Sequence, residues 1–353
     1  MLKLMFLMGM LSLTLFVSQG YAGQVNSFIY HRFDESRYPS TNIAADIFTQ
    51  QLNYIKKMKI EVISLGEVAT CLTEEMTLPD HAVSFSIDDA FRSFYDVGMP
   101  IIRNFGFPVT LFVNTDAVGT AGYLTWEELK ELSAEGVEIG NHSANHAYLV
   151  EFKPGETHEQ WKKRIGDDID KAQQKFKKHL GFKPTLFAYP YGEYSVDVIE
   201  IIKTFGFKVA FAQQSGVIHS DQNRFVLPRF PMGGGFATLT GFKTKLAMQP
   251  LLVTGEDPFD PIIKQNPPSL NLQIPGKQIH PRRFNCFVQG ENKCWVESDE
   301  TNRPGWYRVV AEKPLTGRRN KYTLTLQSQQ GAWLWYSHLW VNAKNPAKKE
   351  GEI

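Results

Sequence analysis

Short β-rich runs alternate with amphipathic helical stretches over roughly residues 26–229, and this alternation restricts the fold more than any other feature of the chain. The runs with strand character are residues 27–31, 61–64, 82–88, 109–113, 137–140, 185–189 and 208–212. The helical stretches between them include residues 46–58, 126–134, 158–179 and 196–204. Because such alternation is typical of parallel strands covered by helices, the sequence predicts an α/β fold, a distorted (β/α) barrel of seven strands.

The composition changes beyond residue 250, where the alternation of strands and helices stops. Prolines then recur at a spacing that no helix would tolerate, at Pro258, Pro261, Pro267, Pro268 and Pro275. Residues 322–326 alternate between polar and apolar and residues 333–336 are an aromatic run, so both indicate antiparallel strands. The predicted organisation is a barrel domain over residues 23–250, a proline-rich linker over 251–273, a β-sandwich-like domain over 274–345 and a tail over 346–353.

The first 22 residues have the pattern of a secretory signal peptide. Lys3 precedes an almost unbroken apolar run over residues 4–17, and Gly20 and Ala22 provide the small residues of a cleavage site. The run is short for a membrane span, although an uncleaved anchor helix is the alternative. We therefore expect an exported protein, periplasmic or extracellular, with no stable transmembrane span after processing.

The charges of the chain are nearly balanced, with 38 basic and 37 acidic residues and a formal net charge of +1 at pH 7. Non-specific binding to nucleic acid or to an anionic membrane requires a large basic surplus. We therefore expect no nucleic-acid partner, and the balance gives slight support to a neutral substrate.

Three cysteines are present, and export would permit a disulfide. Cys286 and Cys294 flank a turn-like centre between two strand-like arms, so they could face each other across a hairpin. Whether they form a disulfide stays open at this point. Cys71 is left over, and we interpret it as a small buried apolar residue rather than a nucleophile.

Two adjacent carboxylates, Asp88 and Asp89, end the strand-like run at residues 82–88. At the end of a buried strand such a pair would repel and lose hydration, so it implies either a cation or two separate roles in one cleft. Barrels of this type gather their chemistry at the C-terminal ends of their strands. His31 ends the first predicted strand and His142 follows the fifth, so these side chains should share one face of the barrel.

His142 and His146 lie four residues apart, close enough for one tight loop or helical turn to direct both imidazoles to one point. With one carboxylate of the acid pair they would form three protein ligands with an open position, as in a catalytic zinc site. Cobalt, nickel and iron suit the same ligands. Adjacent residues leaving a strand point in different directions, so one acid could bind the metal and the other could take a proton from water. Surface or packing histidines are the alternative.

These residues fall in motifs that resemble a known family. The runs 86–90 (SIDDA), 142–146 (HSANH) and 187–192 (FAYPYG) look like the first three motifs of the polysaccharide deacetylases of carbohydrate esterase family four. The resemblance covers about residues 25–235, and the chain is similar to the subgroup that includes exported poly-N-acetylglucosamine deacetylases.

The resemblance implies a role for each matching position. Asp88 would be the general base that activates a metal-bound water, and Asp89, His142 and His146 would be the metal ligands. The backbone N–H of Tyr191 would help to bind the oxyanion. The implied activity is removal of N-acetyl groups from an N-acetylated amino-sugar polysaccharide, such as poly-N-acetylglucosamine or peptidoglycan. The implied partner is this polymer, and the C-terminal domain could bind glycan or an envelope component.

The chain also departs from the family pattern, because Ala188 stands where the third motif has an arginine and the late motifs have no clear match. Two residues could compensate. His31 could be the general acid, the alternative being a satisfied core histidine. Arg229 could pair with Asp88, the alternative being an ordinary surface arginine. A catalytically silent glycan-binding homologue, an O-acetyl esterase and a non-sugar amidohydrolase are the rival functions.

Overall fold

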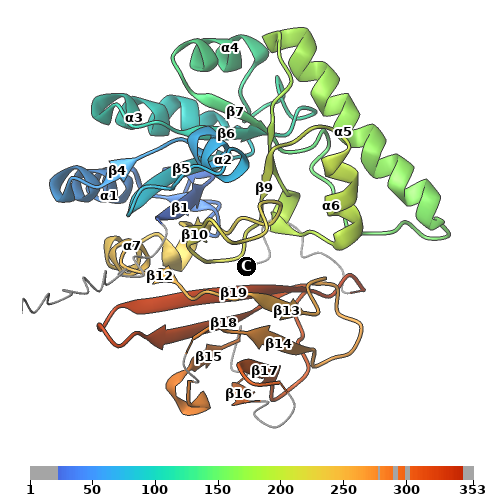
Figure 1. The fold of residues 1–353 in the computed structure, drawn as a ribbon. Coiled ribbons are helices and arrows are strands. Elements are labelled where there is room, and N and C mark those ends of the chain that lie inside the picture. The colour runs from blue at the N-terminus through green and yellow to red at the C-terminus, as the bar shows by residue number, and fades with distance from the viewer. Residues whose placement is uncertain (1–22, 277–278, 289–292, 299–302, 345–353) are drawn as a thin grey trace, which may run out of the picture.

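The computed structural model describes residues 23–276, 279–288, 293–298 and 303–344. The predicted signal peptide and the predicted tail lie outside the described residues. Figure 1 shows two bodies, an α/β body with helices around a curled sheet and, beneath it, an all-β body made from the C-terminal part of the chain. No helix within the described ranges combines the length and the apolar character that crossing a bilayer requires.

A curled sheet forms the centre of the α/β body, and its main path runs in the order β10-β1-β5-β6-β7-β8-β9. The strands are β1 (Gln24–Tyr30), β5 (Ala82–Asp88), β6 (Thr110–Val113), β7 (Glu138–Asn141), β8 (Leu186–Ala188), β9 (Val209–Phe211) and β10 (Ile218–His219). All neighbours on this path are parallel except β10, which runs antiparallel to β1. Short strands β4 (Glu61–Val62) and β11 (Phe230–Pro231) pair beside it. The predicted α/β class and distorted barrel are therefore confirmed.

Helices lie against this sheet, and their amphipathic sequences explain the packing. They are α1 (Ala45–Met58), α2 (Leu65–Thr73), α3 (Met99–Phe105), α4 (Trp126–Ala134), α5 (His158–Leu180), α6 (Val196–Lys203) and α7 (Leu239–Leu246). In α5, Trp161, Ile165 and Ile169 recur every four residues and are buried, so one apolar face meets the barrel. Shorter elements are β2 (Arg32–Phe33), β3 (Asn42–Ile43), η1 (Phe94–Gly98), η2 (Pro190–Gly192), η3 (Gly234–Phe236) and η4 (Pro281–Arg283).

One apolar cluster closes the end of the barrel where the strands begin. It joins residues of α2, such as Val68, to side chains near the start of several strands, such as Val25, Ala82 and Val209. Because this end is packed with apolar side chains, we expect the polar and catalytic side chains at the opposite end, where the strands finish.

The segment at residues 227–231 bridges β9 and β1 of the barrel sheet. Leu227 exchanges backbone hydrogen bonds of 2.9 Å with Ala210 and Ala212 beside β9. Three residues later, Phe230 of β11 pairs in parallel with Phe28 of β1. The segment therefore spans from β9 to β1, and Arg229 lies between the two pairings.

The C-terminal body contains two four-stranded sheets, with the orders β12-β19-β18-β15 and β13-β14-β17-β16. The strands are β12 (Gln249–Pro250), β13 (Gly255–Asp257), β14 (Ser269–Gln273), β15 (Asn285–Phe287), β16 (Cys294–Ser298), β17 (Trp306–Ala311), β18 (Arg319–Gln327) and β19 (Trp333–Val341). Buried residues of both sheets, such as Leu272 and Leu324, form one apolar cluster between them. We call this body the β-sandwich.

The prediction of a linker over residues 251–273 is wrong in part, because β13 and β14 lie there and pair with each other within the β-sandwich. The strands were not predicted because prolines lie next to them and make the segment look irregular. Pro258 directly follows β13 and Pro268 directly precedes β14, so neither proline is inside a strand. β14 keeps the expected alternation, with Leu270 and Leu272 buried between more exposed polar neighbours.

The two bodies share packed side chains. Leu339 and Val341 of β19 belong to an apolar cluster that includes Val198 of α6. The ring of Trp335 packs edge-on against Phe230, and its Nε1 donates to the carbonyl of Ser215 at 3.1 Å. The β-sandwich is therefore attached to the barrel by buried contacts as well as by the chain itself.

The structure joins Cys286 and Cys294 by a disulfide. Cys71 is free and only partly buried, and burial raises the pKa of its thiol, as expected for an unreactive cysteine.

Candidate active site

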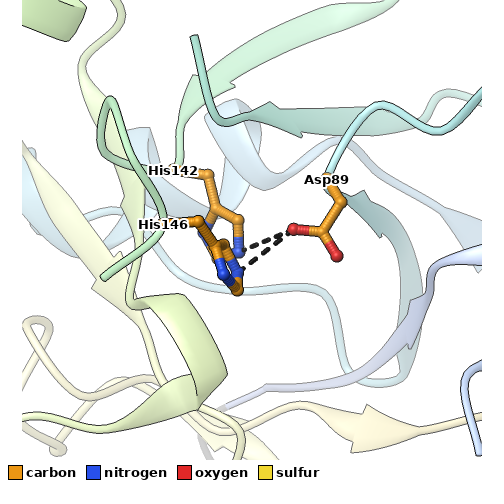
Figure 2. A group of neighbouring side chains, drawn as sticks. All are labelled: Asp89, His142 and His146. Atoms are coloured by element: carbon orange, nitrogen blue, oxygen red, sulfur yellow. Dashed lines mark ion pairs between the residues drawn. The ribbon is translucent and has the colours of Figure 1, made fainter. Parts of the chain in front are cut away.

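Three side chains meet at the end of the barrel where the strands finish. One donor atom from each of Asp89, His142 and His146 lies within 4.8 Å of the other two. Figure 2 shows the two imidazole rings together, facing the carboxylate of Asp89. Asp89 Oδ1 is 3.2 Å from His146 Nε2 and 3.6 Å from His142 Nε2. Ligands about 2.1 Å from a tetrahedral cation lie about 3.4 Å apart, so this donor set fits a zinc-sized ion.

The backbone around the three side chains is strained. Five non-glycine residues of the site loops have a positive φ, namely Asp89, Ala90, Ser143, His146 and Tyr191. Each such residue costs about 1–2 kcal/mol, so the surrounding structure must hold it. One support is visible at the histidine loop, where the carboxylate of Asp168 accepts the backbone N–H groups of Ala144 at 3.0 Å and Asn145 at 3.2 Å.

The hydrogen bonding and burial of the histidines favour the ligand form of the imidazole. His142 Nδ1 lies 2.8 Å from the carbonyl of Ala188, so Nδ1 carries the hydrogen and the lone pair of Nε2 faces Asp89. Burial lowers the pKa of His142 and lowers the pKa of His146 to about 4. Both rings are therefore neutral at pH 7, as metal binding requires.

Asp88 lies beside this cluster, with Oδ2 3.8 Å from His142 Nε2, and forms an ion pair with Arg229. The guanidinium donates from Nη1 to Oδ1 at 2.7 Å and from Nη2 to Oδ2 at 3.0 Å. Arg229 is fully buried and also donates to the carbonyl of Ala212 and the hydroxyl of Ser86. Burial by itself would raise the pKa of Asp88, but the charge and hydrogen bonds of Arg229, together with the nearby His142 and His31, outweigh burial and lower the pKa. Asp88 is therefore ionised, and Arg229 is not a surface arginine.

His31 lies just beyond β1, near the acid pair. Burial lowers the pKa of its imidazole, while the charges of Asp88 and Asp89 act on the ring in the opposite direction. Its side chain is partly exposed, unlike a packed core histidine. Its position beside Asp88 is therefore compatible with proton transfer.

A cavity of about 220 Å³ opens beside the three-residue cluster. Its lining includes Asp89, His146, Tyr123 and Tyr191. The ring of Tyr191 lies 4.5 Å from that of His146, centre to centre, so Tyr191 forms one wall of the cavity next to the His146 ring. Gly192 must be glycine, because a Cβ there would lie 2.2 Å from that of Gln213.

Several residues that shape the site could not be predicted from the sequence. Asp168 lies in a lysine-rich helix whose pattern indicates only a solvated surface. Arg318 and Arg319 contact the loop of Tyr191 from the β-sandwich. Only the run of two adjacent arginines distinguishes them in the sequence, and a surface pair looks the same.

Comparison with known proteins finds a family whose sequence model matches part of the barrel. Residues 75–210 match the model of the polysaccharide deacetylase family. The family resemblance inferred from the motifs is therefore confirmed. The matched region contains Asp88, Asp89, His142, His146 and Tyr191, but neither Arg229 nor the β-sandwich.

Similar curated proteins include a putative polysaccharide deacetylase of Bacillus subtilis strain 168, YxkH, which is 21% identical over 59% of this chain and 71% of its own. The poly-beta-1,6-N-acetyl-D-glucosamine N-deacetylase of Staphylococcus aureus strain MRSA252 is 23% identical over 59% of this chain and 73% of its own.

Solved structures show the same fold. The Streptococcus pyogenes deacetylase PplD, in complex with acetate, superposes with a TM-score of 0.56 at 21% identity, over 63% of this chain and 98% of that one. IcaB from Ammonifex degensii superposes with a TM-score of 0.55 at 24% identity, over 64% of this chain and 97% of that one. At this level of identity the likeness establishes the fold alone.

Proposed function

We propose that the protein is a metal-dependent hydrolase that removes N-acetyl groups from an N-acetylated amino-sugar polysaccharide, such as poly-N-acetylglucosamine or peptidoglycan. The observation that carries the proposal is the cluster of Asp89, His142 and His146 beside an ionised Asp88, within a polysaccharide deacetylase domain. The substrate class is supported by the name of the Staphylococcus aureus relative.

The cluster would hold a divalent cation, with zinc as the first choice and cobalt, nickel or iron also compatible with the ligands. Such a cation supplies positive charge that polarises the acetamide carbonyl and lowers the pKa of water. The remaining roles are those of the chain's own side chains and backbone.

Asp88 takes a proton from the attacking water, because it is ionised and adjacent to the cluster, with Oδ2 3.8 Å from His142 Nε2. Arg229 orients both carboxylate oxygens of Asp88 and keeps the acid charged. In this role it replaces the arginine that is absent at Ala188. Arg229 lies on the segment that bridges β9 and β1, whereas an arginine at position 188 would lie at the end of β8.

Two further steps complete the reaction. The backbone N–H of Tyr191 donates to the developing oxyanion, at a position next to His146. An amine is a poor leaving group unless it is protonated, and His31, which lies near the acid pair, donates that proton.

The cellular setting follows from the sequence. Export directed by residues 1–22 would bring the enzyme to polymers of the cell envelope, in the periplasm or outside the cell. Within the chain, the barrel would be the catalytic domain, and the β-sandwich offers a surface for glycan or for an envelope partner.

The direct test is acetate release from N-acetylglucosamine oligomers by the metal-loaded protein, compared with Asp88→Asn and with an EDTA-treated sample. We expect both to lose activity by at least about a hundredfold, because the base and the cation each act in the transition state. Asp167→Asn is the matched control, since Asp167 is an exposed carboxylate on α5 that pairs only with a surface lysine.

Two outcomes would contradict the proposal. Metal-loaded, folded protein that binds the oligomers without releasing acetate would indicate a silent glycan-binding protein. Release of acetate from O-acetyl esters but not from N-acetyl sugars would indicate an esterase, because an ester leaving group needs less help from a general acid.

A further inference from the structure

Two consecutive arginines of the β-sandwich reach the loop that carries Tyr191. Arg318 immediately precedes β18, and Arg319 is the first residue of that strand. Both lie outside the region that matches the family. Their contacts therefore connect a part of the chain with no assigned role to the wall of the proposed active site.

Arg318 forms a buried ion pair with Glu193, two residues after Tyr191. Its Nε donates to Oε1 at 2.9 Å and its Nη2 donates to Oε2 at 2.9 Å. The side chain of Glu193 is 0% exposed and that of Arg318 is 7% exposed, so water screens the pair very little. A bidentate pair of this kind sets the orientation of both groups as well as their distance.

A stack of rings continues from Arg318 to the metal site. The guanidinium lies 4.0 Å from the centre of the Tyr148 ring. That ring is stacked on Tyr191, with centres 3.8 Å apart and planes inclined by 7°. Tyr191 in turn contacts His146 at 4.5 Å. A displacement of Arg318 would therefore be transmitted to the ring that adjoins a proposed metal ligand.

Arg319 acts on the backbone of the same loop. Its Nη1 donates to the carbonyl of Tyr191 at 2.5 Å and to Oε1 of Gln213 at 3.1 Å. Tyr191 has a φ of 59° and a ψ of 1°, a conformation that a residue with a side chain rarely adopts. When both the carbonyl and the ring of Tyr191 are held, the direction of its N–H is determined as well.

The two arginines are themselves held in place. β18 pairs with β19 along its whole length, from Arg319 opposite Val341 to Gln327 opposite Trp333. Val341 is buried in the cluster that includes α6 of the barrel. The arginines thus project from a hairpin that is packed against the barrel, and not from a free loop.

We propose that Arg318 and Arg319 are positioning residues of the active site, which hold the Tyr191 loop in its strained conformation so that the N–H of Tyr191 meets the oxyanion. The β-sandwich is then a working part of the enzyme. This inference rests on the proposed deacetylase function for its catalytic consequence, but the holding of the loop can be measured without activity.

The test compares Arg319→Ala and Arg319→Lys with the unaltered protein, using the exposed Arg308→Ala of the same β-sandwich as the control. The first readout is hydrogen–deuterium exchange of the backbone amides within residues 189–193, where all but Pro190 have an amide hydrogen. The second is kcat and KM for acetate release from N-acetylglucosamine oligomers, with metal content measured alongside.

For Arg319→Ala we expect exchange in the loop to rise about tenfold, because a hydrogen bond that restrains it is lost. We expect kcat to fall about ten- to a hundredfold, with KM and metal content nearly unchanged, because only the alignment of a transition-state donor is disturbed. Lysine should restore part of kcat, since it can still donate to the carbonyl. Arg308→Ala should change neither readout.

Arg318 is tested by a double substitution, because Arg318→Ala alone would leave Glu193 charged and buried and could prevent folding. Arg318→Met with Glu193→Gln removes both charges and keeps the volume. Faster exchange at residues 189–193 supports the proposal, and exchange equal to that of the unaltered protein overturns it for Arg318.

Failure of this inference and failure of the proposed function give different results. If the unaltered protein releases no acetate, the proposed function fails, and the exchange data still decide whether the arginines hold the loop. If acetate is released but Arg319→Ala changes neither exchange nor kcat, the positioning role is overturned. A change in KM alone would also overturn it, because it would make Arg319 a substrate-binding residue.

Discussion

The barrel and the β-sandwich use their backbones differently. Within the described residues, every non-glycine residue with a positive φ lies in the first 191 positions, and five of the eight surround the proposed metal site. None lies in the described part of the β-sandwich, whose strands alternate regularly around an apolar core. Strained backbone persists only where surrounding contacts hold it. The site loops of the barrel therefore lower the stability of the fold, whereas the regular core of the β-sandwich raises it.

At the interface between the two bodies, the regular β-sandwich contacts the strained loops of the barrel. The same β18–β19 hairpin that buries Val341 in the barrel also presents Arg319 to the strained loop at Tyr191. A region whose described non-glycine residues all have a negative φ therefore contacts a loop in which Tyr191 has a positive φ. Substitutions on each side should separate the two contributions.

The largest effect is expected from removing a proposed metal ligand. His142→Ala should reduce acetate release by about a thousandfold or more, because the charge supplied by a bound cation is worth several kcal/mol in the transition state. Its metal content, measured by elemental analysis, should fall in parallel. The melting temperature of the metal-free variant should match or exceed that of the metal-free parent, since a site residue is not there for stability. A large loss of stability with metal still bound would show that His142 serves the fold and not the metal site.

A smaller effect on turnover is expected from His31, the proposed general acid. His31→Gln should lower kcat by about a hundredfold or more on N-acetylated oligomers, because the amine would leave unprotonated. Metal content should be unchanged, since His31 is not part of the ligand cluster. Activity on an O-acetyl ester should suffer less, and this ratio is the discriminating measurement. Unchanged kcat on the oligomers would remove His31 from the mechanism.

The smallest effect on catalysis is expected from the core of the β-sandwich. Leu324→Ala should lower the free energy of unfolding by about 2–5 kcal/mol, because it leaves a cavity in a fully buried cluster. Urea denaturation measures this loss, and kcat of the folded fraction should stay near that of the parent. Trp333→Ala, at an exposed position of β19, is the control and should change stability little. If Leu324→Ala lowers kcat as strongly as Arg319→Ala, the β-sandwich acts through its general rigidity and not through the arginines.

Local patterns predicted much of the barrel. The run at residues 82–88 is β5 with the same bounds, and the helical stretch at residues 126–134 is α4. Both elements could be predicted because they depend on the spacing of apolar residues along the chain, which can be read from the sequence. The two strands within residues 251–273 could not be predicted in this way, because a short strand flanked by prolines has the same local sequence pattern as a linker.

The strand ends and the proposed ligand set could be predicted from local sequence, since Asp88 and Asp89 are adjacent and His142 and His146 share one short loop. The charged residues that support them come from distant parts of the chain. Arg229 reaches Asp88 across 141 positions of the chain, and Arg318 reaches Glu193 across 125. Spacing in sequence carries no information over such separations, because the partners are chosen by barrel closure and by the packing of one body on another.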